Sequence, residues 1–298
     1  MNTTARLALF GGTLALLAAG GFAVGGAVGP VPATTGESAG HGDPGGEHAG
    51  MADDLPGGLA SSKDGYTFTP AGTGLEPGRF TFTITGPDGK PVTGYDVEHE
   101  KKLHLIVVRR DTAGFRHVHP EMAPDGTWSV PLALPAAGSY RAFADFTPTG
   151  GPALTLGTDL SVAGDYQPAT HAPSRTAQVD GYTVQLAGDL TAGKTSPLTL
   201  TVSRDGVPVT DLQPYLGAYG HLVALREGDL AYLHVHPHGA PGDSRTAPGP
   251  EIEFAAEVPS AGTYRLFLDF RHGGVVRTAE FTLPTAGTPA APTDGHGH

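Results

Sequence analysis

His104 to Pro120 reads HLIVVRRDTAGFRHVHP, and His221 to Pro237 reads HLVALREGDLAYLHVHP. In each stretch, an apolar run that begins with a histidine leads through a short polar segment to a second run that ends in His-Val-His-Pro. Apolar runs on either side of a short polar segment predict a β-hairpin. The two stretches are displaced by 117 residues, so the sequence predicts one such hairpin in each of two repeats.

The repetition extends well beyond the hairpins. Three further pairs of segments match: Gly65–Thr67 with Gly181–Thr183, Asp88–Thr93 with Asp205–Thr210, and Gly138–Phe146 with Gly262–Phe270. The last pair is displaced by 124 residues, because the second repeat has a longer loop at His238–Pro250. Loops beside a site carry specificity more often than loops elsewhere, so this enlarged loop is of interest.

Short runs of alternating apolar and polar residues dominate both repeats. Tyr66–Thr69 and Phe80–Ile84 are examples, and Pro87–Lys90 is one of the turns between such runs. This alternation is typical of half-buried strands, and a helical period is not visible in either repeat. We therefore predict an all-β protein of two tandem immunoglobulin-like antiparallel β-sandwiches that follow an N-terminal hydrophobic leader.

Changes in composition divide the chain into segments. Residues 1–29 carry one basic residue, Arg6, before an apolar Gly-rich run, as a signal peptide or a membrane anchor does. Residues rich in Gly, Pro, Ala and Ser follow and predict a flexible linker. The predicted segments are 1–29 signal peptide or anchor, 30–60 linker, 61–163 first sandwich, 164–178 linker, 179–285 second sandwich and 286–298 disordered tail.

The composition excludes several classes of function. The 298-residue chain has a net charge of -12 without basic clusters, which argues against binding of nucleic acid. It has no cysteine, so disulfides, thiolate metal sites and thiol catalysis are excluded. With only three methionines, its 14 histidines are the available ligands for a transition metal.

The histidines of each hairpin are expected to converge. Side chains at i and i+2 of a strand share one face, so His117 and His119 lie together, as do His234 and His236. If the first turn centres on Arg110-Asp111 and the second on Glu227-Gly228, His104 opposes His117 and His221 opposes His234. The histidine face is apolar, so we expect it on the core side of each sandwich.

Three imidazoles on one patch suit a bound Zn(II) or Cu(II) ion. The predicted ligands are His104, His117 and His119 in the first repeat and His221, His234 and His236 in the second. Asp145 and Asp269 are candidates for a fourth ligand or for an acceptor that fixes a histidine tautomer. Against this, Asp269 points away from the alternating core residues of its strand. His238 could extend the second cluster, whereas unrepeated His99 and His272 are expected at the surface.

The paired hairpins, together with the later FADF and FLDF segments, resemble secreted bacterial proteins with tandem immunoglobulin-like domains. The resemblance covers about residues 56 to 285, and it implies this fold and a link to heavy-metal or copper handling. His-Val-His on a sandwich strand also looks like the copper ligand pair of Cu,Zn superoxide dismutases. That likeness ends there, because the chain has no Cys pair and no His-rich zinc loop after the strand.

Two functions from different classes fit these observations. The first is an exported protein, secreted or held by its N-terminal segment, that binds Cu(II) or Zn(II) for buffering, resistance or delivery. The alternative is a non-catalytic cell-surface module that binds an extracytoplasmic protein or a glycan and whose histidines are structural. No Ser-His-Asp order, Gly-rich phosphate loop or paired-carboxylate motif is visible, so we do not expect an enzyme.

Overall fold

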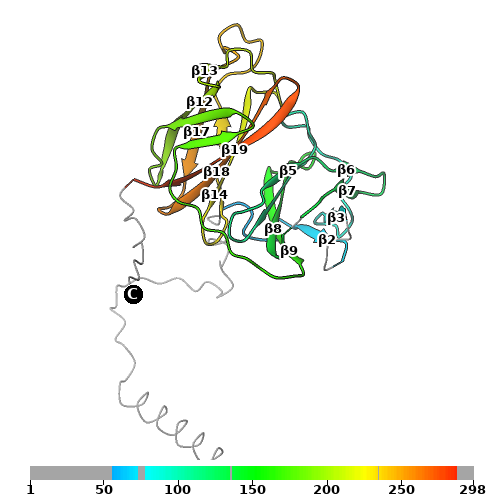
Figure 1. The fold of residues 1–298 in the computed structure, drawn as a ribbon. Coiled ribbons are helices and arrows are strands. Elements are labelled where there is room, and N and C mark those ends of the chain that lie inside the picture. Colours follow the sequence, from blue (N-terminus) through cyan, green and yellow to red (C-terminus); the bar gives the residue numbers. More distant parts are fainter. Residues whose placement is uncertain (1–55, 73–77, 135, 234, 287–298) are drawn as a thin grey trace, which may run out of the picture. The chain divides into compact units, whose positions relative to one another are not determined.

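Each repeat folds into two antiparallel sheets in the computed structural model (Figure 1), which describes residues 56–72, 78–134, 136–233 and 235–286. The predicted leader, nearly all of the first linker, His234 and all but the first residue of the tail lie outside the described residues. No element of the described chain is a helix, and none could cross a membrane as one. The predicted all-β, tandem immunoglobulin-like architecture is confirmed.

The first repeat consists of nine strands. Its two sheets have the orders β1-β2-β3-β7-β6 and β5-β4-β8-β9. The strands are β1 Ser62–Lys63, β2 Tyr66–Pro70, β3 Arg79–Thr85, β4 His104–Arg109, β5 Arg116–Val118, β6 Glu121–Met122, β7 Thr127–Pro131, β8 Gly138–Phe146 and β9 Leu154–Val162.

The second repeat has the same strand order. One sheet runs β10-β11-β12-β17-β16 with β13 paired to β12, and the other runs β15-β14-β18-β19. The strands are β10 Thr176–Val179, β11 Tyr182–Ala187, β12 Lys194–Arg204, β13 Val207–Pro208, β14 Gly220–Arg226, β15 Tyr232–Leu233, β16 Val235–Pro237, β17 Glu251–Val258, β18 Thr263–His272 and β19 Val275–Pro284.

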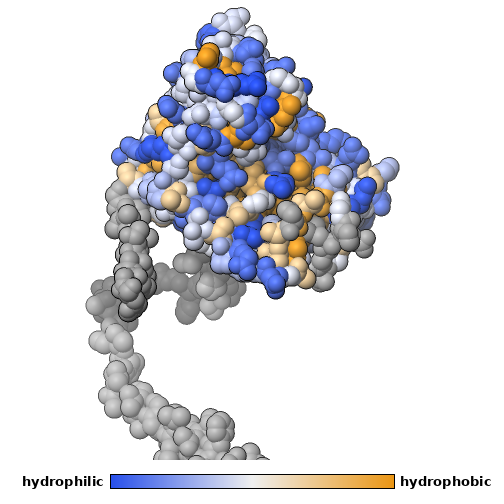
Figure 2. All heavy atoms as spheres, in the orientation of Figure 1, coloured by the Kyte–Doolittle hydropathy of each residue, from blue (hydrophilic) through white to orange (hydrophobic). Residues whose placement is uncertain are grey.

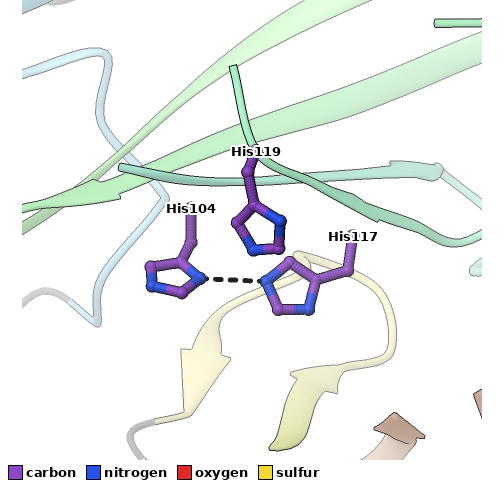
Figure 3. Close-up of side chains that lie close together, drawn as sticks. All are labelled: His104, His117 and His119. Atoms are coloured by element: carbon purple, nitrogen blue, oxygen red, sulfur yellow. Dashed lines mark hydrogen bonds between the residues drawn. The ribbon is translucent and has the colours of Figure 1, made fainter. Parts of the chain in front are cut away.

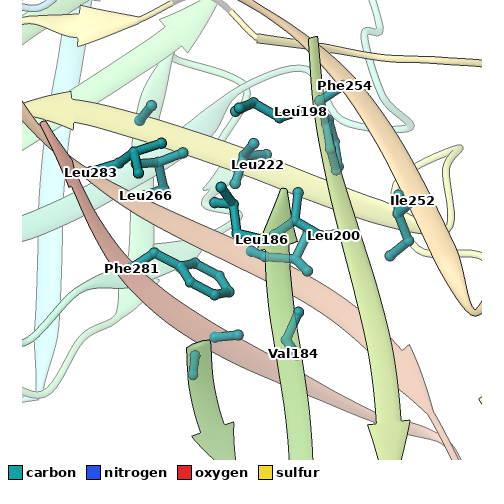
Figure 4. Close-up of a cluster of buried hydrophobic side chains, with 14 of the residues drawn as sticks. Val184, Leu186, Leu198, Leu200, Leu222, Ile252, Phe254, Leu266, Phe281 and Leu283 are labelled. Carbon is teal, nitrogen blue, oxygen red and sulfur yellow. The ribbon is translucent and has the colours of Figure 1, made fainter. Parts of the chain in front are cut away.

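Each sandwich has an apolar core between its sheets. In the second repeat, Leu198 and Leu200 of β12 pack with Leu222 of β14 and Leu266 of β18 (Figure 4). Phe82 and Trp128 stack in the corresponding core of the first repeat. β3 and β17 alternate buried with less buried residues, as strands with one face toward solvent should. Hydrophilic residues cover much of the face drawn in Figure 2.

β4 departs from this alternation, because all six of its residues are buried. Leu105 and Val107 point into the core of the first sandwich, whereas Ile106 and Val108 belong to a third apolar cluster. Residues of both repeats form this third cluster: Ile106, Val108, Phe115, Phe143, Val223, Leu225, Leu230 and Phe267. It lies within the single compact unit Met51–His298, so the two repeats pack against each other through β4, β14 and their neighbours.

Candidate metal centre

Three histidine rings of the β4–β5 hairpin converge in the first repeat (Figure 3). His104 opens β4, His117 lies in β5 and His119 follows β5. One nitrogen of each ring lies within 4.8 Å of the corresponding nitrogens of the other two. This convergence was predicted, and the structure shows a group of residues that could hold a metal ion.

The register that brings the rings together differs from the predicted one. His117 lies opposite Ile106 rather than His104, and in the second hairpin Ala224 lies opposite Leu233. Each turn centres one residue later than expected, on Asp111-Thr112 and on Gly228-Asp229. The pairing therefore shifts by two residues, which is an even number, so the side chains stay on their predicted face.

The predicted location of that face was wrong. We expected the histidine face on the core side of each sandwich because its neighbours are apolar. The structure instead turns this face toward the other repeat: Ile106, two residues after His104, and Val223, two residues after His221, lie in the third cluster. The apolar neighbours are explained by contact between the repeats rather than by the sandwich core.

A carboxylate of the second repeat holds a histidine of the first. The Nδ1–H of His117 donates to Oδ2 of Asp269 at 2.8 Å, and the two side chains are 1% and 4% exposed. The hydroxyl of Thr278 donates to Oδ1 of the same carboxylate at 2.6 Å. Asp269 points away from the core of its own sandwich, as the alternation of its strand predicts, and its carboxylate reaches the other repeat.

The remaining nitrogens of His104 and His117 face each other. The Nε2–H of His104 donates to the carbonyl oxygen of Glu98 at 3.1 Å, since a carbonyl can only accept. Nδ1 of His104 and Nε2 of His117 lie 3.1 Å apart. One proton between these two nitrogens makes a hydrogen bond, and a metal cation bound to both nitrogens would replace that proton.

Burial lowers the pKa of two rings of this group. It lowers the pKa of His104 to about 4, although the hydrogen bond to Glu98 opposes the shift. Burial, reinforced by the neighbouring His117 and His104, lowers the pKa of His119 to about 3. Nε2 of His119 is a buried nitrogen without a hydrogen-bond partner among the described residues. A buried and unpaired acceptor is costly, and a cation would satisfy it.

The second repeat places His221 beside the same three rings. Its ring stacks on that of His104 with centroids 5.4 Å apart, and it lies 4.9 Å from the ring of His117. Burial, and then the neighbouring His117, hold the pKa of His221 well below its usual range. The histidines of the two repeats therefore meet in one place, whereas the sequence treated them as two clusters.

The other predicted residues lie in different surroundings. His236 is exposed in β16, opposite Ala255. The Asp145 carboxylate is half-buried and accepts a hydrogen bond from the Thr155 hydroxyl at 3.0 Å. His238 lies 3.7 Å from Glu253 at the surface, outside the group of three. His234 lies outside the described residues.

The structure adds one residue that sequence analysis had assigned to the surface. His99 is exposed as expected, but its ring lies 5.4 Å from that of His221 and 6.1 Å from that of His104. It has a positive φ of 46° in the loop before β4. His99 has no counterpart in the second repeat, so internal repetition could not identify it.

The family assignment agrees with the repeated fold. The family described as Domain of unknown function (DUF8832) matches the chain twice, over residues 61–166 and 177–287. The chain belongs to this family. No curated protein matches the sequence.

Solved structures with similarity to the chain include an S-layer protein, a putative membrane anchored protein and an integrin-binding protein. Domains 5-6 of the S-layer protein SbsC are 15% identical with a TM-score of 0.21, over 74% of this chain and 97% of that one. A putative membrane anchored protein from Corynebacterium diphtheriae is 14% identical with a TM-score of 0.22, over 77% of this chain and 61% of that protein. The bacterial integrin-binding protein invasin is 14% identical with a TM-score of 0.19, over 73% of this chain and 39% of that protein. The chain spans less than two thirds of the last two proteins.

Proposed function

We propose that the protein binds a divalent transition-metal ion, Cu(II) or Zn(II), through His104, His117 and His119. The observation that carries this proposal is the convergence of one nitrogen from each of the three rings, with Nδ1 of His104 and Nε2 of His117 only 3.1 Å apart. Metal–nitrogen bonds of about 2.0–2.1 Å to two atoms 3.1 Å apart make an angle of about 100° at the ion. That angle suits two ligands of one tetrahedral ion, and His119 supplies a third nitrogen.

The carboxylate of Asp269 supports this assignment. A histidine ligand usually donates its other ring N–H to a carboxylate or a carbonyl, which fixes the tautomer and the orientation of the ring. His117 donates to Asp269 and His104 donates to the carbonyl of Glu98, so both rings have such a partner. Neutral imidazoles without thiolates or thioethers favour Cu(II) and Zn(II) over Cu(I).

The proposed role is storage, buffering or delivery of the ion outside the cytoplasm. The apolar leader of residues 1–29 is the reason to propose export, with the segment either cleaved or kept as an anchor. We propose binding without turnover, because the carboxylate that contacts the group, that of Asp269, already accepts hydrogen bonds from His117 and Thr278.

Calorimetric titration of the chain with Cu(II) and with Zn(II) tests the proposal. We expect binding at micromolar or lower ion concentration, and a loss of at least tenfold in affinity in His119→Ala, which removes one of three ligands. His238→Ala is the matched control, because this exposed histidine lies outside the group. Equal affinity in the parent and in His119→Ala, or no binding in either, would reject the proposal and leave the interaction module as the better description.

A further inference from the structure

The contact between the two repeats is reciprocal. Phe115 of the first repeat stacks on Phe267 of the second, with ring centroids 4.0 Å apart. Tyr232 of the second repeat contacts Phe143 of the first, with ring centroids 5.9 Å apart. Tyr232 is the counterpart of Phe115, and Phe143 is the counterpart of Phe267. Each repeat therefore offers the other the same surface, and a feature on one side of the contact has an equivalent on the other side.

Two aspartates, Asp145 and Asp269, follow this relation. His104 lies opposite Asp145 across β4 and β8, and His221 lies opposite Asp269 across β14 and β18. Each carboxylate accepts a hydrogen bond from a threonine on the next strand, Thr155 in one case and Thr278 in the other. Asp269 serves the proposed metal site of the first repeat, so Asp145 is the equivalent group on the side of the second repeat.

A hollow of about 190 Å³ lies where that equivalence places a second site. Side chains of both repeats line it, including those of His99, His104, His221, His236 and Asp145. His104 thus borders both the hollow and the group of three histidines. The hollow therefore joins solvent, through exposed His99 and His236, to buried rings.

The wall of the hollow contains a buried ring nitrogen that lacks a hydrogen-bond partner among the described residues. This nitrogen is Nδ1 of His221. Asp96, Glu98 and Asp145 contribute carboxylates to the hollow, against two lysines, Lys101 and Lys102. This balance of three acidic against two basic side chains favours a cation.

We propose that this hollow binds a second divalent transition-metal ion, held by His99, His221 and His236 with the carboxylate of Asp145 in its wall. The inference rests on the proposed function, since it assigns the same ion class to a neighbouring position. The second position faces solvent, whereas the first is buried, so the second ion exchanges faster. His104 borders both positions, so an ion that enters the hollow arrives next to the buried site.

Counting bound ions in the full chain tests the inference. Histidines of the segments outside the two repeats could also bind ions, so the background carries His41→Ala, His48→Ala, His296→Ala and His298→Ala. In this background we expect two Cu(II) ions per chain by equilibrium dialysis. His99→Ala combined with His236→Ala should bind one, because both residues are exposed and neither belongs to the group of three.

Electron paramagnetic resonance of Cu(II) provides a second measurement. The ring of His104 at the first position stacks on that of His221 at the second, with centroids 5.4 Å apart. Two Cu(II) ions bound this close together should broaden each other's signal. The double variant should lose the broadening. His171→Ala is the matched control, because its ring contacts the backbone of Asp111 away from the hollow. Thermal unfolding of each variant checks that it is folded.

The outcomes separate the two proposals. One ion per chain in the background protein, or two ions in the His99→Ala, His236→Ala variant, overturns the second position and leaves the first intact. No bound ion in the background protein overturns both. Two ions that fall to one in the double variant but stay at two in His171→Ala support the second position.

Discussion

At the residue scale, the two ring nitrogens of His104 have different partners, and so do those of His117. In His117, Nδ1 is occupied by Asp269, which leaves Nε2 to face His104. In His104, Nε2 is occupied by the carbonyl of Glu98, which leaves Nδ1 to face His117. The outer partners thus hold one nitrogen of each ring, and the two remaining nitrogens point to one place, as the ligands of a metal site must.

Asp269→Asn should lower the affinity for the ion about 10- to 100-fold, although this residue does not touch the ion. The amide is neutral and no longer enforces the tautomer of His117. Titration with Zn(II) or Cu(II) measures the change. Asp159→Asn is the matched control, because that carboxylate pairs with Arg110 and Arg141 elsewhere in the first repeat. An unchanged affinity in Asp269→Asn would contradict the role given to this carboxylate.

At the element scale, β4 and β14 are buried on both faces. Each strand gives one face to its own sandwich core and the other to the opposite repeat. The histidines begin this second face, so the packing of Phe115 on Phe267 and the bond between His117 and Asp269 belong to one surface. Packing and ion binding should therefore be coupled.

Phe267→Ala tests this coupling. Removal of a buried phenylalanine ring costs about 3–5 kcal/mol of the free energy of unfolding. It should also weaken ion binding, because Asp269 lies two residues along the same strand. Chemical denaturation and calorimetry measure the two effects. Phe267→Leu keeps most of the apolar volume and should restore much of both. A variant that loses stability but binds the ion with parental affinity would show that the two are independent.

The turn between β4 and β5 carries a second carboxylate with a structural role. Burial raises the pKa of Asp111, but the hydrogen bond from Arg109 and those from the Ala169 and Ala113 amides outweigh it and lower the pKa to about 2. The pKa is therefore lower in the folded state than the usual value of 3.8 for this carboxyl group. The stability that Asp111 contributes is therefore present above about pH 4 and is lost as the pH falls toward 2.

Asp111→Asn should lower the free energy of unfolding by about 1–3 kcal/mol near pH 6. The difference from the parent should shrink at pH 3, where the parent has lost part of the contribution. Urea denaturation at the two pH values measures it. Asp125→Asn serves as control for an exposed turn carboxylate with only local contacts. A difference between parent and Asp111→Asn that is the same at both pH values would argue against an ionised Asp111 as its source.

At the scale of the whole molecule, the ion should stabilise both repeats together. Its three proposed ligands come from the first repeat and the carboxylate that supports them from the second. A ligand that binds only the folded state adds about 2.7 kcal/mol at a concentration of 100 times its Kd.

Saturation with Zn(II) should therefore raise the unfolding temperature in one cooperative transition, and a chelator should reverse the change. Differential scanning calorimetry measures it. His238→Ala should respond like the parent, and His119→Ala should respond much less. Stabilisation of one repeat alone, seen as two separate transitions in the presence of the ion, would contradict the shared site.

The sequence by itself determined the all-β class, the tandem repeat, the alternation of the strands and the choice of His104, His117 and His119. These follow from local patterns, since period-two alternation and i, i+2 spacing act within a few residues. Only the tertiary structure decided that the histidine face meets the other repeat, that Asp269 holds His117 and that His99 and His221 come close. An apolar face looks the same in sequence whether it covers its own core or another domain, because hydrophobic burial has no direction. Residues 152 positions apart, such as His117 and Asp269, have no local signal that connects them.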